Sequence, residues 1–284
     1  MTLFEKNSVL TFDIEDWYNC DFISDNLNWD NHEVRIYDGV ERILELLKEY
    51  NTKATFFCLG WIAEKHPDVI RMINNNGHHI GCHSYQHQLA YKFSRAEFYK
   101  DTERAKKLLE DVTGNAVDAY RAPAFSIIES NLNYLECLVD LNFKYDASIL
   151  PAKHDYGGIP SFKCKSPFIF ETVNGTIKEF PMSTFGKKIK IIYSGGGYFR
   201  ILPFPFIKLL SNQNDYLMTY FHPRDFDVNQ PRIYDLPVHR KIKSYIGLKG
   251  AFLKLEKYLG TFDFNSIRDA DIQVNWVNQQ VIKV

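Results

Sequence analysis

Short apolar runs alternate along the first half of the chain with longer segments in which apolar residues recur at helical spacing. The short runs predict strands at 8–13, 53–60, 78–84, 117–123 and 144–148. The longer segments predict helices at 38–51, 66–77, 94–114 and 129–142. Strands and helices in strict alternation favour a parallel α/β sheet or barrel.

Residues at the ends of these segments support the predicted helices. Ser94 and Glu97 have the spacing of a capping box, and Gly114 follows the same helix as a stop signal. Asp38 is the expected N-cap of the first helix, and Pro67 lies in the first turn of the second.

The pattern loosens in the second half of the chain. Glycines and prolines between residues 151 and 205, including the stretch "SGGGYF", predict loops and hairpins. An apolar strand then returns at 215–223 and a helix at 249–262. Because neither a linker nor an internal repeat separates the halves, we expect one domain over 1–284, with an extension from about 230 to 284 packed on it.

Composition narrows the class of protein. A net charge of −1 over 284 residues argues against a nucleic-acid partner, and the chain lacks the apolar run of about 18 residues that a transmembrane segment needs. The first residues do not resemble a signal peptide. Five scattered cysteines, Cys20 among them, without CxxC spacing predict reduced thiols. We therefore expect a cytoplasmic protein, with contact at a membrane surface left open; the oligomeric state is not predicted.

Ionisable side chains follow five of the predicted strands, a pattern that packing alone does not require. In parallel α/β folds, the carboxyl ends of the strands form the active face. The residues at these positions are Asp13, Glu15, Asp16, His83, His87, Arg121, Asp146, His222 and Asp225.

His83 and His87 are the candidate metal ligands in this set. Four residues apart on a helical turn or tight loop, they can face the same ion, and the carboxylates after the first strand supply a third ligand. Two histidines and one carboxylate leave coordination positions open, as a catalytic ion needs. Zn²⁺ is the default expectation, and such a site also accepts Co²⁺, Ni²⁺ or Fe²⁺.

Five motifs together make the chain resemble the polysaccharide deacetylases, the NodB-like carbohydrate esterases of family 4. The motifs are "LTFDIED", "GHHIGCHSYQH", "YRAPAF", "YDAS" and "YFHP", in the order and approximate spacing of the family. Later stretches, such as "IKEFPMST", resemble the branch found with exopolysaccharide and surface-glycan biosynthesis. The resemblance implies a distorted (β/α) barrel of about seven parallel strands with an elaborated C-terminal half.

The resemblance also implies roles for the motif residues. Asp13 matches the general base, and His83 and His87 match the metal histidines. Arg121 matches the arginine that steers the base. Asp146 resembles the aspartate that orients the catalytic histidine, and His222 resembles that histidine, the general acid.

The motif "DIED" leaves the third metal ligand undecided. Strand alternation places Glu15 on the same face as Asp13, whereas a turn or bulge at the strand end would bring Asp16 round instead. Relatives offer precedents for both arrangements, so Glu15 and Asp16 are both carried forward as ligands.

Several residues are expected to line the substrate groove. The resemblance assigns the Ala124 backbone N–H to the oxyanion and places Tyr220 where a leucine often lines the acetyl pocket. Trp17 follows the carboxylate cluster and is expected to begin the groove wall. Tyr198 and Phe199 are expected as sugar-stacking faces on a loop.

Together these features predict a metal-dependent hydrolase that removes the N-acetyl group from an amino sugar. The substrate would be a polysaccharide, an oligosaccharide or a lipid-linked glycan precursor. The alternatives are a related amidase acting on a non-sugar C–N bond and a non-catalytic glycan-binding module.

Overall fold

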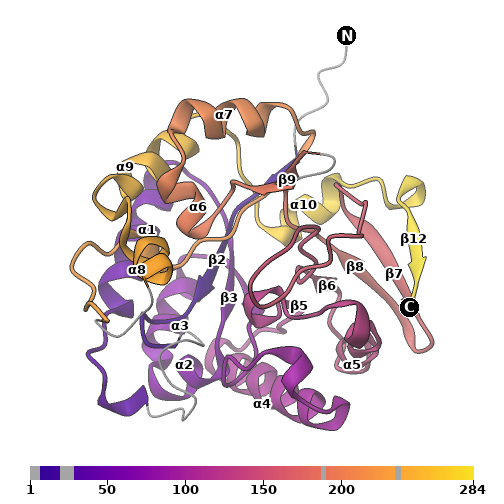
Figure 1. Cartoon of the computed structure of the whole chain (residues 1–284). Helices are drawn as coiled ribbons and strands as arrows, with labels where there is room; N and C mark the ends of the chain where they lie inside the picture. The colour runs from indigo at the N-terminus through magenta and orange to yellow at the C-terminus, as the bar shows by residue number, and fades with distance from the viewer. Residues whose placement is uncertain (1–6, 20–28, 187–189, 234–237) are drawn as a thin grey trace.

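A computed structural model describes residues 7–19, 29–186, 190–233 and 238–284 (Figure 1). Within these ranges seven parallel strands form the barrel framework. They are β2 (Thr11–Ile14, preceded by β1, Asn7–Val9), β3 (Thr55–Cys58), β4 (His79–Cys82), β5 (Ala119–Tyr120), β6 (Tyr145–Asp146), β8 (Gly175–Glu179) and β11 (Tyr216–Met218). The predicted fold class, a distorted α/β barrel, is confirmed.

Between β8 and β11 the described residues form no backbone ladder, and a side chain closes the ring of strands there. The chain after β8 passes beside β11, and the Met218 N–H donates a hydrogen bond to Ser183 Oγ at 2.8 Å. The Ser183 hydroxyl lies 3.5 Å from the Tyr216 carbonyl oxygen. On its other side, β11 pairs with β1, and its continuation bonds β2 through the Asp13 N–H and the Phe221 carbonyl oxygen at 2.7 Å.

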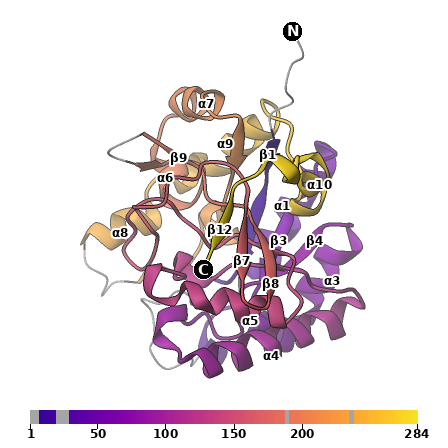
Figure 2. The ribbon, with the colours of Figure 1, turned by 90° about the vertical axis from the view of Figure 1, so that its right-hand side faces the viewer.

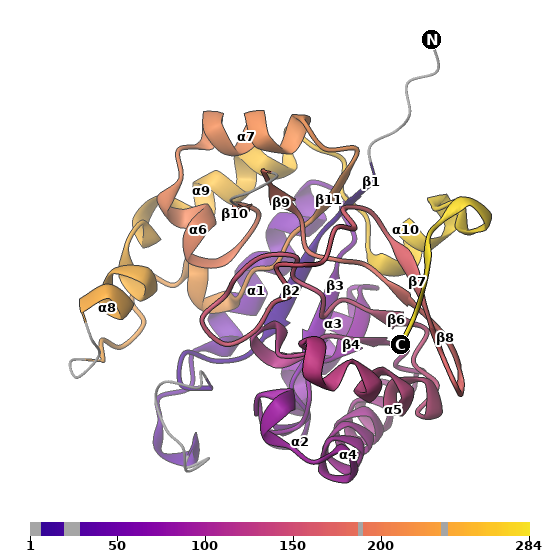
Figure 3. The same ribbon diagram turned by 45° about the vertical axis from the view of Figure 1, so that its right-hand side comes forward.

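Helices surround the barrel (Figures 1 and 3). The first half contributes α1 (Ile36–Glu49), α2 (Gly60–Lys65), α3 (Pro67–Asn75), α4 (Arg95–Thr113) and α5 (Leu135–Asp140). The second half contributes α6 (Gly196–Ile201), α7 (Phe204–Asn212), α8 (Val238–Tyr245), α9 (Leu248–Leu259) and α10 (Ile267–Gln273). Each helix in the described ranges is too short or too polar to cross a bilayer.

Four further strands of the described residues lie outside the ring. β7 (Phe168–Thr172) forms an antiparallel hairpin with β8, and β12 (Val281–Lys283) adds to β7 in parallel (Figure 2). β9 (Thr184–Phe185) and β10 (Ile191–Ile192) form a separate antiparallel pair. The expected single domain over 1–284, with an extension from about 230 packed on it, stays a prediction.

Most predicted helix ends are confirmed, with one exception. Ser94 and Glu97 form the capping box of α4, and Gly114 ends that helix with φ 68°. The prediction for Asp38 is wrong, because α1 begins two residues earlier, at Ile36. A remote carboxylate, that of Asp16, accepts the N–H groups at this helix start.

The stretch "SGGGYF" is another correction, since it begins helix α6 instead of forming a loop. Its first glycines allow a close approach to the strand end at Tyr220. A Cβ on Gly195 would lie 1.9 Å from the Tyr220 carbonyl oxygen, and the Gly196 N–H donates to that oxygen at 3.0 Å. The glycines therefore serve contact between helix and barrel. Of the predicted reduced cysteines, Cys20 lies outside the described residues, and the four described ones are free thiols.

A guanidinium lies among apolar side chains in the barrel interior. Arg121 is fully buried, and its guanidinium donates to Thr11 Oγ1 and Asp13 Oδ1, each at 2.7 Å, and to the Ala147 carbonyl oxygen at 3.2 Å. The ring of Phe57 lies 4.3 Å from its central carbon. The surrounding cluster includes Val9, Ala119, Tyr145, Phe180, Met182 and Met218.

Because Ser183 links β11 to the chain after β8, its removal tests barrel closure. In Ser183→Ala the buried Met218 N–H loses its acceptor, and we expect a loss of about 1–3 kcal/mol in the free energy of unfolding. Urea denaturation followed by circular dichroism measures this loss. Ser130→Ala, at an exposed position, is the matched control, and equal stability of the two variants would contradict the closure role.

Candidate active site

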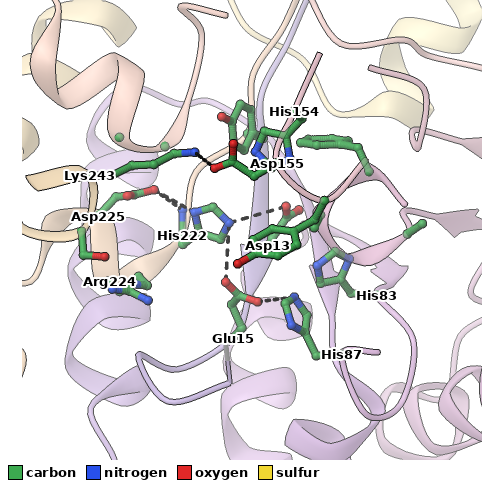
Figure 4. Close-up of a pocket in the computed structure, with 18 of the residues that line it drawn as sticks. Asp13, Glu15, His83, His87, His154, Asp155, His222, Arg224, Asp225 and Lys243 are labelled. Atoms are coloured by element: carbon green, nitrogen blue, oxygen red, sulfur yellow. Dashed lines mark hydrogen bonds and ion pairs between the residues drawn. The ribbon is translucent and has the colours of Figure 1, made fainter. Parts of the chain in front are cut away.

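A pocket of about 180 Å³ lies at the carboxyl ends of the barrel strands (Figure 4). Segments from both halves of the chain line it. The first half contributes the ends of β2 and β4 and the turn after β5, and the second half contributes 154–156, 196–200, 220–225 and 243–244. Of the residues predicted for the site, the pocket brings together Asp13, Glu15, His83, His87, Ala124, Tyr220 and His222.

Asp13 is held at the pocket floor by the buried guanidinium. Its Oδ1 accepts the hydrogen bond from Arg121 Nη1, and its Oδ2 lies 3.9 Å from Nε2 of His222. One carboxylate oxygen is therefore fixed by the barrel and the other lies toward the candidate acid.

Glu15, His83 and His87 form the candidate metal centre. One ligand atom of each lies within 4.8 Å of the others, and all three residues are buried. Glu15 Oε2 is 2.6 Å from His87 Nε2. This donor set of two imidazoles and one carboxylate fits a divalent cation with an open coordination position. The structure thus favours Glu15, and not Asp16, as the carboxylate ligand.

The surroundings of His83 orient it as a ligand. Its Nδ1 lies 2.8 Å from the Arg121 carbonyl oxygen, which can only accept, so Nδ1 carries the proton and Nε2 is the lone-pair nitrogen. Burial lowers the pKa of His83 to about 4, which keeps the imidazole neutral near pH 7. Burial opposes ionisation of Glu15, but the nearby histidines His87 and His222 hold its pKa below its ordinary value.

The loop between the two histidines is tight, as predicted. Ser84 and His87 both adopt left-handed backbone conformations, with φ of 66° and 54°. Ser84 Oγ accepts the His87 N–H at 3.1 Å, which closes the loop and turns the second imidazole back toward the first. The two imidazole centroids are 5.3 Å apart.

Asp16 has a different task from the one expected. Its Oδ2 accepts the N–H groups of Arg35 and Ile36 at 2.8 and 3.0 Å, and its Oδ1 accepts that of Trp17 at 2.7 Å. The carboxylate therefore caps α1 through the N–H groups that every helix start leaves unpaired. Burial raises the pKa of Asp16 to about 6 despite these bonds.

His222 is oriented by Asp225, so the expectation that Asp146 orients it is wrong. Nδ1 of His222 is 2.9 Å from Asp225 Oδ2, which also accepts the His222 N–H at 2.9 Å. Burial by itself would lower the pKa of His222, but the Asp225 carboxylate and its hydrogen bond raise it above the ordinary value. The spacing His222-Pro-Arg-Asp225, a capping pair around a proline, was the signal in the sequence for this contact.

Asp146 instead begins a buried hydrogen-bond chain. Its Oδ1 accepts the Ser148 hydroxyl at 2.6 Å, and Ser148 Oγ accepts the Ala122 N–H at 2.9 Å. Behind it, Glu179 accepts the Ile149 N–H at 3.1 Å. Burial and the neighbouring Asp146 carboxylate raise the pKa of Glu179 well above its ordinary value, which favours its protonated form. This chain supports the turn after β5.

The expected groove walls are only partly found at the pocket. Phe199 is fully buried against Phe221 and Tyr258, so its expected sugar-stacking role is wrong. Trp17 is also buried, with its indole N–H on the Glu33 carbonyl oxygen, and it is not one of the described residues that line the pocket.

Tyr198 is not one of the described residues that line the pocket, but Nζ of Lys243, which does line it, is 5.5 Å from the Tyr198 ring centroid. Further wall residues come from the irregular second half, where sequence periodicity carries no signal. They are His154, Asp155, Tyr156, Arg200, Arg224, Lys243 and Ser244. Lys243 pairs with Asp155 at 3.1 Å, which joins α8 to the 154–156 segment (Figure 4).

Comparison with known sequence families divides the chain in two. Residues 5–144 match the family described as polysaccharide deacetylase. Residues 147–271 match a domain of unknown function, DUF3473.

Curated relatives match about a third or more of the chain. A peptidoglycan-N-acetylglucosamine deacetylase of Bacillus cereus is 38% identical over 93 residues, 33% of this chain and 34% of that protein. A peptidoglycan deacetylase of Helicobacter pylori is 32% identical over 112 residues, 39% of this chain and 37% of that protein. The chain therefore spans little more than a third of the length of these relatives.

One solved structure shares the fold over the whole chain. A crystal structure from Mycobacterium smegmatis, described as a candidate polysaccharide deacetylase, has a TM-score of 0.67 and 18% sequence identity. The match covers 100% of this chain and 95% of that one. At this identity the likeness concerns the fold alone.

Alanine substitutions at the two adjacent carboxylates separate their tasks. We expect Glu15→Ala to weaken binding of Zn²⁺, as a probe cation, more than the roughly 10–100-fold typical of outer-shell changes. We expect Asp16→Ala to weaken Zn²⁺ binding by no more than this roughly 10–100-fold loss. The same variant should lower the free energy of unfolding by about 1 kcal/mol, because α1 loses its cap. Competition with a chromogenic chelator and urea denaturation measure the two effects. The assignment fails if Asp16→Ala loses more Zn²⁺ affinity than Glu15→Ala.

Proposed function

Residues 5–144 of this chain belong to the polysaccharide deacetylase family, and from this premise we propose that the protein hydrolyses the N-acetyl group of an amino sugar. The observation that carries the proposal is the meeting of Asp13, His222 and the Glu15–His83–His87 centre in one pocket. A base, an acid and a cation site within a few ångströms are what amide hydrolysis requires.

A divalent cation held by Glu15, His83 and His87 would supply Lewis acidity, which makes an amide carbonyl more electrophilic and a water molecule more acidic. Asp13 receives the water proton at Oδ2, while Arg121 keeps Oδ1 in place. His222 donates its Nε2 proton to the departing nitrogen. The Asp225 carboxylate, which contacts the other ring nitrogen, Nδ1, favours the protonated imidazole that carries this proton.

The acid and the base remain distinct because their surroundings differ. Asp13 contacts a permanent positive charge, whereas His222 contacts a carboxylate. Ala124, which lines the same pocket, would offer its N–H to the oxyanion as the cation polarises the carbonyl.

The substrate class rests on the family and on its relatives. The curated relatives are named for peptidoglycan and N-acetylglucosamine, which supports an acetylated amino sugar. We propose a glycan or glycan precursor as the natural substrate, with Zn²⁺ as the cation. The lipid-linked form and the cytoplasmic location are parts of this proposal that await experiment.

Acetate release from N-acetylated chitooligosaccharides tests the proposed function. Asp13→Asn removes the proton acceptor while keeping the shape, and we expect kcat to fall by roughly 10²–10⁴-fold. His222→Ala should cause a loss of similar size. Dialysis against a chelator should abolish the activity and Zn²⁺ should restore it. Wild-type rates in both variants would overturn the proposal, and release from small non-sugar amides alone would favour an amidase.

The pH profile tests the role of Asp225. Its charge raises the pKa of His222, so Asp225→Asn lowers that pKa and the acid loses its proton at lower pH. We expect the basic limb of the kcat/KM profile to move to lower pH by about one unit or more. Asp227→Asn is the control, because Asp227 pairs with Arg35 instead of His222. An unchanged basic limb in Asp225→Asn would contradict the role.

A further inference from the structure

The turn after β5 holds two consecutive residues in a conformation that side chains disfavour. Ala124 has φ 51° and ψ 25°, and Phe125 has φ 55°. Left-handed backbone is unfavourable for each residue that is not glycine, because its Cβ comes too close to the following carbonyl oxygen. Such a turn persists only where its surroundings hold it. Ala124 lines the pocket, so whatever holds the turn also holds a wall of the site.

One support comes from the chain just after β6. Ser148 Oγ accepts the Ala122 N–H at 2.9 Å and donates to Asp146 Oδ1 at 2.6 Å. All three residues are buried. The start of the turn is thereby bonded to a side chain whose own orientation is fixed.

A second support comes from two glycines further along. The Gly158 N–H donates to the Phe125 carbonyl oxygen at 3.0 Å. Gly157 lies so close to the turn that a Cβ there would come within 2.2 Å of the Phe125 carbonyl oxygen and 2.5 Å of that of Ala124. Real Cβ atoms do not approach oxygen this closely, so only glycine fits without moving the turn.

We propose that Ser148, Gly157 and Gly158 clamp the Ala122–Phe125 turn and so position the Ala124 N–H for the oxyanion. All three clamp residues lie in the 147–271 segment, whose family has no assigned function. The clamp thus gives that segment a positioning task in the site, in addition to supplying His222 and Asp225. The catalytic part of this inference rests on the proposed deacetylase function, whereas the structural part does not.

Gly157→Ala tests the clamp, because alanine at this position collides with the turn while its own backbone stays unstrained. We expect the amide resonances of Ala124 and Phe125 to shift in protein labelled with ¹⁵N-alanine and ¹⁵N-phenylalanine. We also expect kcat to fall by about 10–100-fold, less than the roughly 10²–10³-fold for loss of an oxyanion donor. KM and Zn²⁺ affinity should stay at wild-type values, since the three atoms nearest a Cβ on Gly157 belong to Ala124 and Phe125 and not to the candidate metal ligands.

Gly114→Ala is the control for a strained glycine outside the site. Its φ is 68°, and a Cβ there meets nothing within 4 Å, so stability falls while the amide signals of the turn and kcat stay unchanged. If Gly157→Ala does not fold, Ser148→Ala removes the other support and is expected to shift the same amide signals.

Two results would overturn the clamp. One is unchanged Ala124 and Phe125 amide signals in the folded variant, and the other is shifted signals with an unchanged kcat. A wild-type protein that releases no acetate from any N-acetylated sugar would count against the proposed function alone. In that case the amide signals still decide whether the clamp holds the turn.

Discussion

A fully buried arginine in the barrel interior is the constraint around which the site is built. A guanidinium stays charged at any pH a folded protein meets, and its desolvation costs several kcal/mol unless acceptors surround it. Arg121 meets Thr11, Asp13 and the Ala147 carbonyl oxygen, which belong to β2 and to the chain after β6. Strands far apart in sequence must therefore converge on this one charge. Its own carbonyl oxygen fixes the tautomer of His83, so the same residue orients both the candidate base and a candidate metal ligand.

The functional site joins two segments that match different families. The segment that matches the polysaccharide deacetylase family supplies Asp13 as the candidate base, Arg121 and the candidate metal ligands. The segment of unknown function supplies the candidate acid, the carboxylate on it and the far wall of the pocket. The parallel pairing of β1 with β11 brings His222 to within 4 Å of Asp13 although 208 residues separate them. Neither segment contains both proton-transfer groups.

Corrections to the sequence predictions fall where local pattern cannot distinguish between partners. Glu15 and Asp16 are adjacent carboxylates, and either could serve as a metal ligand. Asp16 instead accepts the N–H groups at the start of α1, because the fold places that helix start beside it. Asp146 lies at the end of a strand as expected, but its carboxylate accepts the hydroxyl of Ser148, which also accepts the Ala122 N–H of the turn after β5. The sequence around Phe199 does not indicate that its ring packs in the core between α6 and α9.

By itself, the sequence determined the alternation of strands and helices in the first half of the chain, the capping of α4 and most of the residues at the strand ends that meet in the pocket. These properties depend on periodicity and on neighbours within a few positions, which local sequence records. Only the tertiary structure decided that Glu15 joins the histidines, that Asp225 serves His222 and that Ser183 links the ends of the barrel. Such choices depend on contacts between distant segments and on burial, because a buried polar group must find its partner wherever the fold places one.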